Sequence, residues 1–139
     1  MVKSYALSCP IAKTLELVGE RWTLLIVRDL LKGAKRFQDL QNSLDGISAN
    51  VLSTRLKLLE DHGIATRRMY SERPPRAEYL LTEKGQTLET VVVALGLWGF
   101  EHIYGGKKTR KHKACGQPIQ CLLYCPTCQE SVHFVDTEV

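Results

Sequence analysis

Histidine and cysteine recur at metal-ligand spacing near the end of the chain. His112 and Cys115 are separated by two residues, and Gly116 follows them. After nine intervening residues, a second pair, Cys125 and Cys128, repeats the two-residue spacing. Two such pairs supply the four soft ligands that tetrahedral zinc requires. We therefore expect a structural zinc site formed by His112, Cys115, Cys125 and Cys128.

The same cluster leaves other assignments open. Cys121 and His133 are spare ligands, and Gln129 stands where a glycine would ease the second turn. The alternatives are a degenerate ribbon that folds without metal and C-terminal thiols that oxidise on isolation. Thiol–disulfide exchange by Cys-x-x-Cys requires a βαβ scaffold with the motif opening a helix, whereas Cys125 and Cys128 lie between two short strand-like runs. We therefore do not expect an enzyme.

A second group of residues could bind nucleic acid. Ser48 is a good N-cap for a helix that continues to residue 62, and Leu52, Leu56 and Leu59 face inward at helical spacing. The outward face is small and polar and consists of Asn50, Ser53, Thr54 and Lys57. After a very short turn, such a face is typical of the second helix of a helix-turn-helix. We predict a recognition helix over residues 48–62 that enters the major groove; two helices packed for stability alone are the alternative.

A hairpin is predicted immediately after this helix. Two strand-like runs, 64–70 and 77–81, flank a connector that contains two prolines. Because proline blocks ladder pairing, we expect the connector to project as a loop rather than continue the strands. Arg73 and Arg76 at its ends could reach phosphate or the minor groove. We interpret residues 70–77 as a wing, with a solvated surface loop as the alternative.

Three further helices are needed to position these elements. Pro10 is pre-set for a first helical turn, which makes Cys9 the N-cap. The predicted ranges are 10–18, 21–31 and 36–43. A thiol at a helix N-terminus, with Lys13 one turn along, is favoured as thiolate, so Cys9 is a redox-sensing candidate. A small buried residue with an inert sulfur is the alternative.

The last predicted helix carries two apolar stripes. Thr82 caps it. The first stripe is expected to cover the chain's own core and consists of Leu88, Val91, Val92, Leu95 and Trp98. The second stripe consists of Val93, Leu97, Phe100 and Tyr104. A second stripe needs a partner, and we expect another copy of the chain, hence a homodimer. Gly105 and Gly106 end the helix, so we place domain boundaries at 1–105 and 106–139.

Length and composition fit one small domain with an appendage. The chain has 139 residues, a net charge of +4 and a pI of about 8.8, which suits a polyanionic partner. The beginning lacks the apolar run of a signal peptide, and the longest apolar stretch, Val91–Phe100, is half of what a membrane span needs. We expect a cytoplasmic protein without a membrane partner, in which the five cysteines form no disulfide framework.

Several short motifs occur in the order of a known family. They are Cys-Pro at 9–10, Gly-Glu-Arg-Trp-Thr at 19–23, Arg-Phe at 36–37, Leu-Ser-Thr-Arg-Leu at 52–56 and Tyr-Leu-Leu-Thr at 79–82. Over residues 6 to 104 the chain resembles the HxlR family of winged-helix transcriptional regulators, which are related to MarR proteins. The resemblance implies a homodimer built by N- and C-terminal helices, with two recognition helices in successive major grooves of double-stranded DNA. It also implies a small-molecule or redox effector, sensed in some relatives through a cysteine placed like Cys9.

The expected fold is therefore mainly α with a small β-hairpin: a winged helix-turn-helix with a zinc-ribbon-like C-terminal extension. The residues expected to contact DNA are Arg36, Ser48, Asn50, Ser53, Thr54, Arg55, Lys57, Arg73 and Arg76. In one mode of sensing known in the family, the cysteine placed like Cys9 pairs with a second cysteine near the recognition helix of the other subunit. This chain has no cysteine between Cys9 and Cys115, so that partner is missing. A winged-helix adaptor that binds protein rather than DNA is the alternative function.

Overall fold

The computed structural model describes residues 4–138 and divides into two compact units, Met1–Val92 and Val93–Val139. The division lies ahead of the boundary expected at Gly105 and Gly106. The assignment of residues 1–105 and 106–139 to separate functional domains stays a prediction. No helix in the described part of the chain is both long and apolar enough to cross a bilayer.

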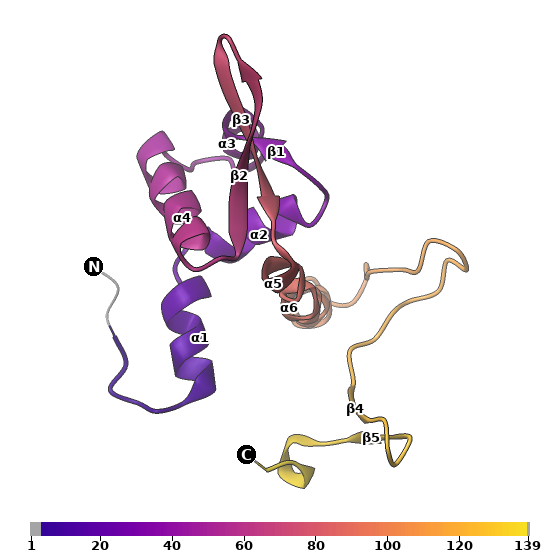
Figure 1. Ribbon diagram of the computed structural model, residues 1–139. Helices are drawn as coiled ribbons and strands as arrows, with labels where there is room; N and C mark the ends of the chain where they lie inside the picture. Colours follow the sequence, from indigo (N-terminus) through magenta and orange to yellow (C-terminus); the bar gives the residue numbers. More distant parts are fainter. Residues whose placement is uncertain (1–3, 139) are drawn as a thin grey trace. The chain divides into compact units, whose positions relative to one another are not determined.

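Four helices of the first unit precede its long hairpin (Figure 1). They are α1 (Pro10–Val18), α2 (Thr23–Leu30), α3 (Phe37–Ser43) and α4 (Ala49–Asp61). The expected caps are confirmed: Cys9 is the N-cap of α1 with Pro10 in its first turn, and the Ser48 hydroxyl accepts a hydrogen bond from the Val51 amide at 3.2 Å. At the other end of α4, the Ile64 amide donates to the Leu59 carbonyl at 2.8 Å, as expected for a glycine-terminated helix.

The wing is the outer part of a three-stranded antiparallel sheet. Its strands are β1 (Lys35–Arg36), β2 (Ala65–Glu72) and β3 (Pro75–Leu81), in the order β1-β3-β2. The short strand β1 was not expected from the sequence, because two residues give no periodic signal. Figure 1 shows β2 and β3 projecting together as one long hairpin.

The prediction that the proline-containing connector would interrupt the strands is wrong. Ser71 pairs with Arg76 and Glu72 with Pro75, after an irregularity in β2 between Met69 and Ser71. Proline is tolerated at the first position of a strand, where Pro75 lies. The hairpin is therefore paired almost to its tip, which makes the wing stiffer than a free loop.

The core of the first unit is formed by apolar side chains from α2, α3, α4 and the start of β2. Its most deeply buried members, at 0–1% exposure, are Ile26, Val27, Leu30, Leu40, Leu52, Leu56 and Leu59. Half-buried side chains pack against this cluster, among them Phe37, Tyr79, Leu88 and Val92. The winged-helix fold expected from the sequence, mainly helical with an antiparallel sheet, is thus confirmed.

The single long helix expected after Thr82 is two helices, α5 (Glu83–Gln86) and α6 (Glu89–His102). Thr82 caps α5 as predicted, because its hydroxyl accepts from the Gly85 amide at 3.1 Å. Between the helices, the Leu88 amide donates to the Gly85 carbonyl at 3.1 Å, a tightened turn of the 3₁₀ type. At Gly85 an added Cβ would lie 2.1 Å from the Ile64 carbonyl oxygen. This close backbone approach fixes α5 against the start of β2. The spacing of apolar residues could not predict it.

The second unit has no residue that is fully buried among those described from Val93 onward. After α6 it contains β4 (Leu123–Cys125), which pairs with β5 (Glu130–Val132), and a 3₁₀ turn over Phe134–Asp136. The first apolar stripe of α6 was expected to be core, but Leu95 and Trp98 are 56% and 60% exposed. That part of the expectation is wrong, because the chain itself covers no more than the start of the stripe.

A buried aspartate ties α2 to α3. Asp29 is 2% exposed and accepts from the Ser43 hydroxyl at 2.6 Å and from the Arg28 guanidinium at 2.9 Å, with the Lys32 ammonium at 3.5 Å. Burial by itself would raise the pKa of Asp29, but the bonds from Ser43 and Arg28 and the charge of Lys32 hold it below its ordinary value. The carboxylate therefore stays charged inside the fold and is fully hydrogen-bonded.

We expect Asp29→Asn to lower the free energy of unfolding by about 1–3 kcal/mol at neutral pH, because the charged acceptor of these bonds is lost. Since the folded-state pKa is lowered, this contribution is present above the unfolded pKa of about 3.9 and fades as the pH falls below it. Urea unfolding of both proteins across this pH range measures the difference. Asp45→Asn, at an exposed aspartate, is the matched control. A constant difference down to pH 2 would contradict the assignment.

Candidate nucleic-acid interface

One face of α4 is buried and the opposite face is open to solvent. Leu52, Leu56 and Leu59 anchor the helix in the core. The expected DNA-reading residues Asn50, Ser53, Thr54 and Lys57 are all exposed. Because the two sets lie on opposite sides of one rigid helix, the polar set is presented together.

Local bonds leave most of this face free to meet a ligand. The Thr54 hydroxyl donates to the Asn50 carbonyl at 2.9 Å, so its oxygen still has acceptor capacity. Lys57 pairs with Asp61 at 3.3 Å, with the two side chains 76% and 58% exposed. Such an exposed pair contributes little and exchanges readily with another anion. Ser48 uses its oxygen as the cap of α4, and its hydroxyl proton is still available to a phosphate oxygen.

Arg55 has a different environment. It is half-buried, and its Nη2 lies 3.0 Å from Glu20 Oε2 on the connection between α1 and α2. This pair helps to hold α4 in place. The expected phosphate contact of Arg55 stays a prediction, and it would require Arg55 to exchange this partner.

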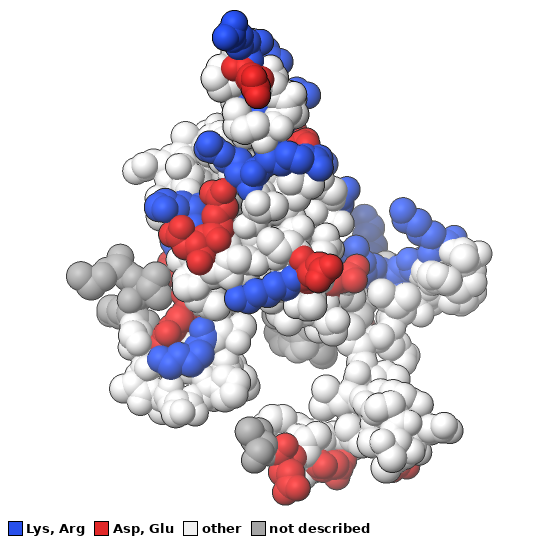
Figure 2. All heavy atoms as spheres, viewed as in Figure 1, with Lys and Arg blue, Asp and Glu red and all other residues white. Residues whose placement is uncertain are grey.

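Arginines gather at the tip of the β2–β3 hairpin, where Figure 2 shows a cluster of positive side chains. Arg73 and Arg76 are exposed on either side of the tip. Sequence reasoning missed Arg67, which is exposed on β2 opposite Tyr79. Its signal was present, since Arg67 stands in a predicted strand outside the apolar positions. Arg68 next to it is bound to Glu78, with Nε 3.0 Å from Oε1.

Arg36 joins the start of α3 to the hairpin. Its guanidinium lies 4.9 Å from the centre of the Tyr70 ring, and its amide donates to Asp39 at 3.0 Å. The side chain is exposed, so the same guanidinium still presents donors to solvent. This contact places a cation at the base of the wing.

Cys9 is half-buried at the N-cap of α1. The Lys13 ammonium, expected to favour its thiolate, lies 3.0 Å from Glu16 Oε1 and donates to the Tyr5 carbonyl at 3.4 Å. The charge of Lys13 is therefore partly neutralised by Glu16. The redox-sensing role of Cys9 stays a prediction.

The tail, residues 106–139, carries the two candidate ligand pairs at two separate turns. His112 Nδ1 is 3.4 Å from Cys115 Sγ, and the Cys128 amide donates to Cys125 Sγ at 3.5 Å. The amide and thiol of Cys128 and the amide of Thr127 hold the pKa of Cys125 below its ordinary value. No three His, Cys, Asp or Glu side chains within residues 4–138 are grouped to hold a metal ion.

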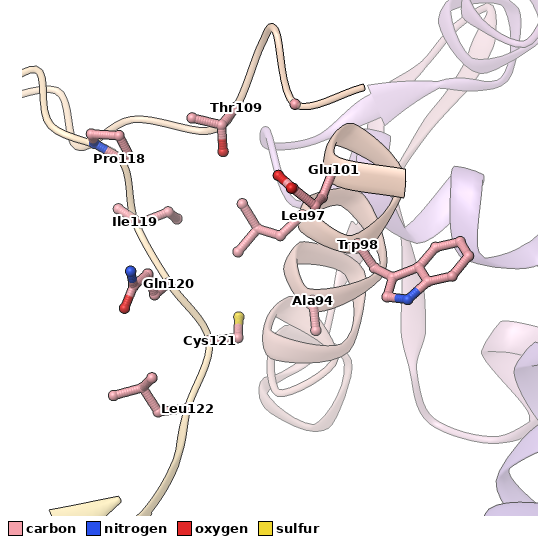
Figure 3. Close-up of a pocket in the computed structure, with 11 residues that line it drawn as sticks. Ala94, Leu97, Trp98, Glu101, Thr109, Pro118, Ile119, Gln120, Cys121 and Leu122 are labelled. Carbon is pink, nitrogen blue, oxygen red and sulfur yellow. The ribbon is translucent and has the colours of Figure 1, made fainter. Parts of the chain in front are cut away.

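Cys121 is separate from both pairs. It lines a pocket of about 530 Å³ between α6 and residues 118–122, and Figure 3 shows its sulfur directed toward α6. Leu97 lines the same pocket and points toward the tail. One member of the stripe expected to face a second copy therefore faces its own chain.

The helix-turn-helix geometry agrees with a known family. The sequence model of the HxlR-like helix-turn-helix family matches residues 17–106. The chain belongs to this family. Its members are transcriptional regulators rather than enzymes, which accords with the absence of any catalytic prediction from the sequence.

Named relatives support the same assignment. An HTH-type transcriptional regulator of Mycobacterium tuberculosis is 41% identical over 125 residues, which cover 88% of this chain and 78% of the relative. One from Synechocystis is 41% identical over 87 residues, 63% of this chain and 64% of the relative.

Solved structures share the fold. The crystal structure of PA1607, described as a candidate transcription factor, aligns with 96% of this chain and 95% of its own at a TM-score of 0.81 and 32% identity. The redox regulator HypR in its oxidized form aligns with 68% of this chain and 97% of its own at a TM-score of 0.65 and 35% identity. The similarity to PA1607 extends beyond the region that the family model matches.

Replacing Arg73 and Arg76 together with alanine should weaken DNA binding and flatten the plot of log affinity against log salt concentration. If each arginine neutralises one phosphate, the slope changes by about 2 units. Fluorescence anisotropy on a labelled duplex at several salt concentrations measures it. Lys84→Ala is the control, because Lys84 donates to the His62 carbonyl away from the hairpin tip. An unaltered slope for the double variant would show that the wing does not touch the backbone.

Proposed function

We propose that the chain binds specific sequences of double-stranded DNA as a homodimer. In this proposal α4 enters the major groove, and the β2–β3 hairpin contacts the backbone or the minor groove. The observation that carries the proposal is the exposed face of α4, whose small polar residues stand on a helix anchored by three buried leucines. Membership in a family of HTH-type regulators supports it.

The residue types on α4 suit the chemistry of base edges. The major groove is wide enough for an α-helix, and each base pair presents there a distinct pattern of donors and acceptors. The Asn50 amide can bond an adenine at two points, and Ser53 and Thr54 can bond either kind of base. Lys57 supplies a positive charge without geometric selectivity. Base preference should therefore depend on Asn50 more than on Lys57.

The hairpin suits contacts that position the protein without reading sequence. Its strands are paired to the tip, so Arg73 and Arg76 are carried on a stiff support. Arg67 adds a third exposed cation along β2. Contacts of this kind fix the register of a protein on the duplex.

The homodimer is inferred from apolar surface that the chain leaves uncovered. No residue of α6 is buried, although the helix consists mainly of apolar residues. A helix that is apolar all round is normally buried. Leu95 and Trp98 on α6, and Ile11 on α1 at 65% exposure, remain open to solvent. A second copy is the partner we propose, because two recognition helices would then read two half-sites.

We propose further that an effector regulates the chain. HypR is described as a redox regulator, and Cys9 is the residue of this chain through which an oxidant could act on α1. A small-molecule effector is equally compatible with the half-buried position of Cys9.

Asn50→Ala should relax the base preference at one position of each half-site, at a cost of about 1–3 kcal/mol if Asn50 makes a bidentate contact. Selection of bound duplexes from a random library, with the full chain, reports the preferred motif. Lys57→Ala is the matched variant and should weaken all sequences alike without changing the motif. Selection of the wild-type motif by Asn50→Ala would remove this residue from direct readout. If the wild-type chain binds no duplex, or binds duplexes with an affinity that does not fall as the salt concentration rises, the adaptor alternative is favoured.

Leu95→Glu should convert the dimer to a monomer and reduce operator binding, because it puts an unpaired charge into an apolar interface. Analytical ultracentrifugation measures the mass, and circular dichroism verifies that the variant is folded. Gln86→Glu adds the same charge at an exposed polar position of α5 and should leave the dimer intact. Dimers of Leu95→Glu with wild-type stability would place the interface elsewhere.

A further inference from the structure

The two ligand pairs of the tail lie at the turns of two hairpins. In the first, the His112 amide donates to the Gln117 carbonyl at 2.9 Å, and Lys111 forms an antiparallel bridge with Pro118. In the second, β4 pairs with β5, and Cys125 lies opposite Glu130 at the end next to the turn. Each pair is thus carried by a closed backbone loop.

The backbone of the two turns follows one pattern. The Gly116 amide donates to the His112 carbonyl at 2.8 Å, and the Gln129 amide donates to the Cys125 carbonyl at 2.8 Å. Gly116 and Gln129 both have left-handed φ angles, of 71° and 58°. Each immediately follows the second residue of its pair. The sequence indicated a departure from the pattern at Gln129, but the structure shows the same turn there without glycine.

Both turns direct polar groups toward their pair of ligands. The 3.4 Å approach of His112 Nδ1 to Cys115 Sγ places two candidate ligand atoms side by side. In the second turn, the Cys128 amide donates to Cys125 Sγ, a bond that favours a sulfur carrying negative charge. Thiolate is the form of cysteine that binds metal.

The tail has no other evident source of stability. None of its described residues is fully buried, and all four of its cysteines are free thiols. Units of about 40 residues or fewer usually need a disulfide, a metal or a partner in order to fold. Two hairpins that each present two soft ligands meet this need when one ion joins them.

We propose that His112, Cys115, Cys125 and Cys128 of one chain bind a single zinc ion that joins the two hairpins. Within residues 4–138 no three such ligands are grouped, so zinc binding requires residues 117–122, between the turns, to change conformation and bring the pairs together. Four protein ligands fill a tetrahedral site and leave no position for water or substrate, so the zinc is structural. Three thiolates leave the site with net negative charge, which Lys111 and Lys113 beside His112 offset.

The spare ligands lie outside the two turns that carry the proposed ligands. Cys121 lies on the segment between the turns, and in this structure it lines the pocket beside α6. The amide of His133 donates to Asp136 at 2.8 Å at the start of the 3₁₀ turn, beyond both hairpin turns. Cys121→Ser therefore serves as a matched control for the ligand cysteines.

Elemental analysis of the full chain, purified without chelators, should give about one zinc per chain. Cys125→Ser should lose the zinc, while Cys121→Ser and Cys9→Ser should retain it. One zinc per two chains would place the site between copies and overturn the proposal. Zinc absent from the wild-type protein, or lost equally from Cys121→Ser, would overturn it as well.

A second measurement does not depend on the folding of variants. Wild-type protein in which cobalt replaces zinc should show the visible bands of a tetrahedral site together with thiolate charge-transfer absorption. Chelation should abolish these bands and increase amide exchange after Gly106, while the helices of the first unit keep theirs. An octahedral cobalt spectrum, or a tail whose exchange is unchanged by the chelator, would contradict a structural tetrahedral site.

Discussion

Burial of the leucine stripe of α4 sets the orientation on which the proposed DNA interface depends. Leu52, Leu56 and Leu59 are at most 1% exposed, and complete burial of a leucine contributes about 1.5–3 kcal/mol. Rotation of α4 would expose these side chains and bury polar ones, so one face is strongly preferred. The Ser48 cap fixes the N-terminal end of the same helix, and the Arg55–Glu20 pair fixes one of its sides. The polar face is therefore presented before DNA arrives, and little ordering is required on binding.

The two units differ in how they are stabilised. The first has an apolar core and a buried, fully bonded Asp29 that links two of its helices. The second has no fully buried residue in its described part, yet it contains an apolar helix and two ligand pairs. These features are explained together if α6 is covered by a second copy and the tail hairpins are joined by zinc. The second copy thus accounts for the uncovered apolar surface of α6, and the zinc accounts for the stability of a tail without fully buried residues in its described part.

Sequence patterns predicted the parts of the fold that follow local rules. Ser48 and Thr82 were identified as caps from their residue type and position, and Cys9 was identified as an N-cap from the proline that follows it. The core face of α4 followed from its spacing. The break between α5 and α6 was missed because the apolar spacing continues across it. The approach of Gly85 to the Ile64 carbonyl, which fixes α5, is a tertiary contact that this spacing does not reveal. The pairing of Pro75 was missed because a rule on proline in strands was applied without regard to strand ends.

In the candidate site, too, the sequence predicted features that follow local patterns and missed contacts between residues distant in the chain. Exposure of Asn50, Ser53, Thr54 and Lys57 could be predicted, since it is the complement of the buried stripe. The engagement of Arg55 by Glu20 could not, because the partners are distant in sequence and no periodic signal connects them. Likewise, the position of Leu97 against its own tail depends on a chain reversal after α6 that composition does not encode.

Methylation interference on a selected duplex tests the central claim most directly. Dimethyl sulfate methylates guanine N7 in the major groove and adenine N3 in the minor groove, and these positions lie on opposite edges of the base pairs. If α4 of each copy reads a major groove, methylation of N7 should prevent binding in two half-sites about 10–10.5 base pairs apart. Interference confined to adenine N3, or no interference at any guanine of a guanine-containing site, would contradict insertion of α4 into the major groove.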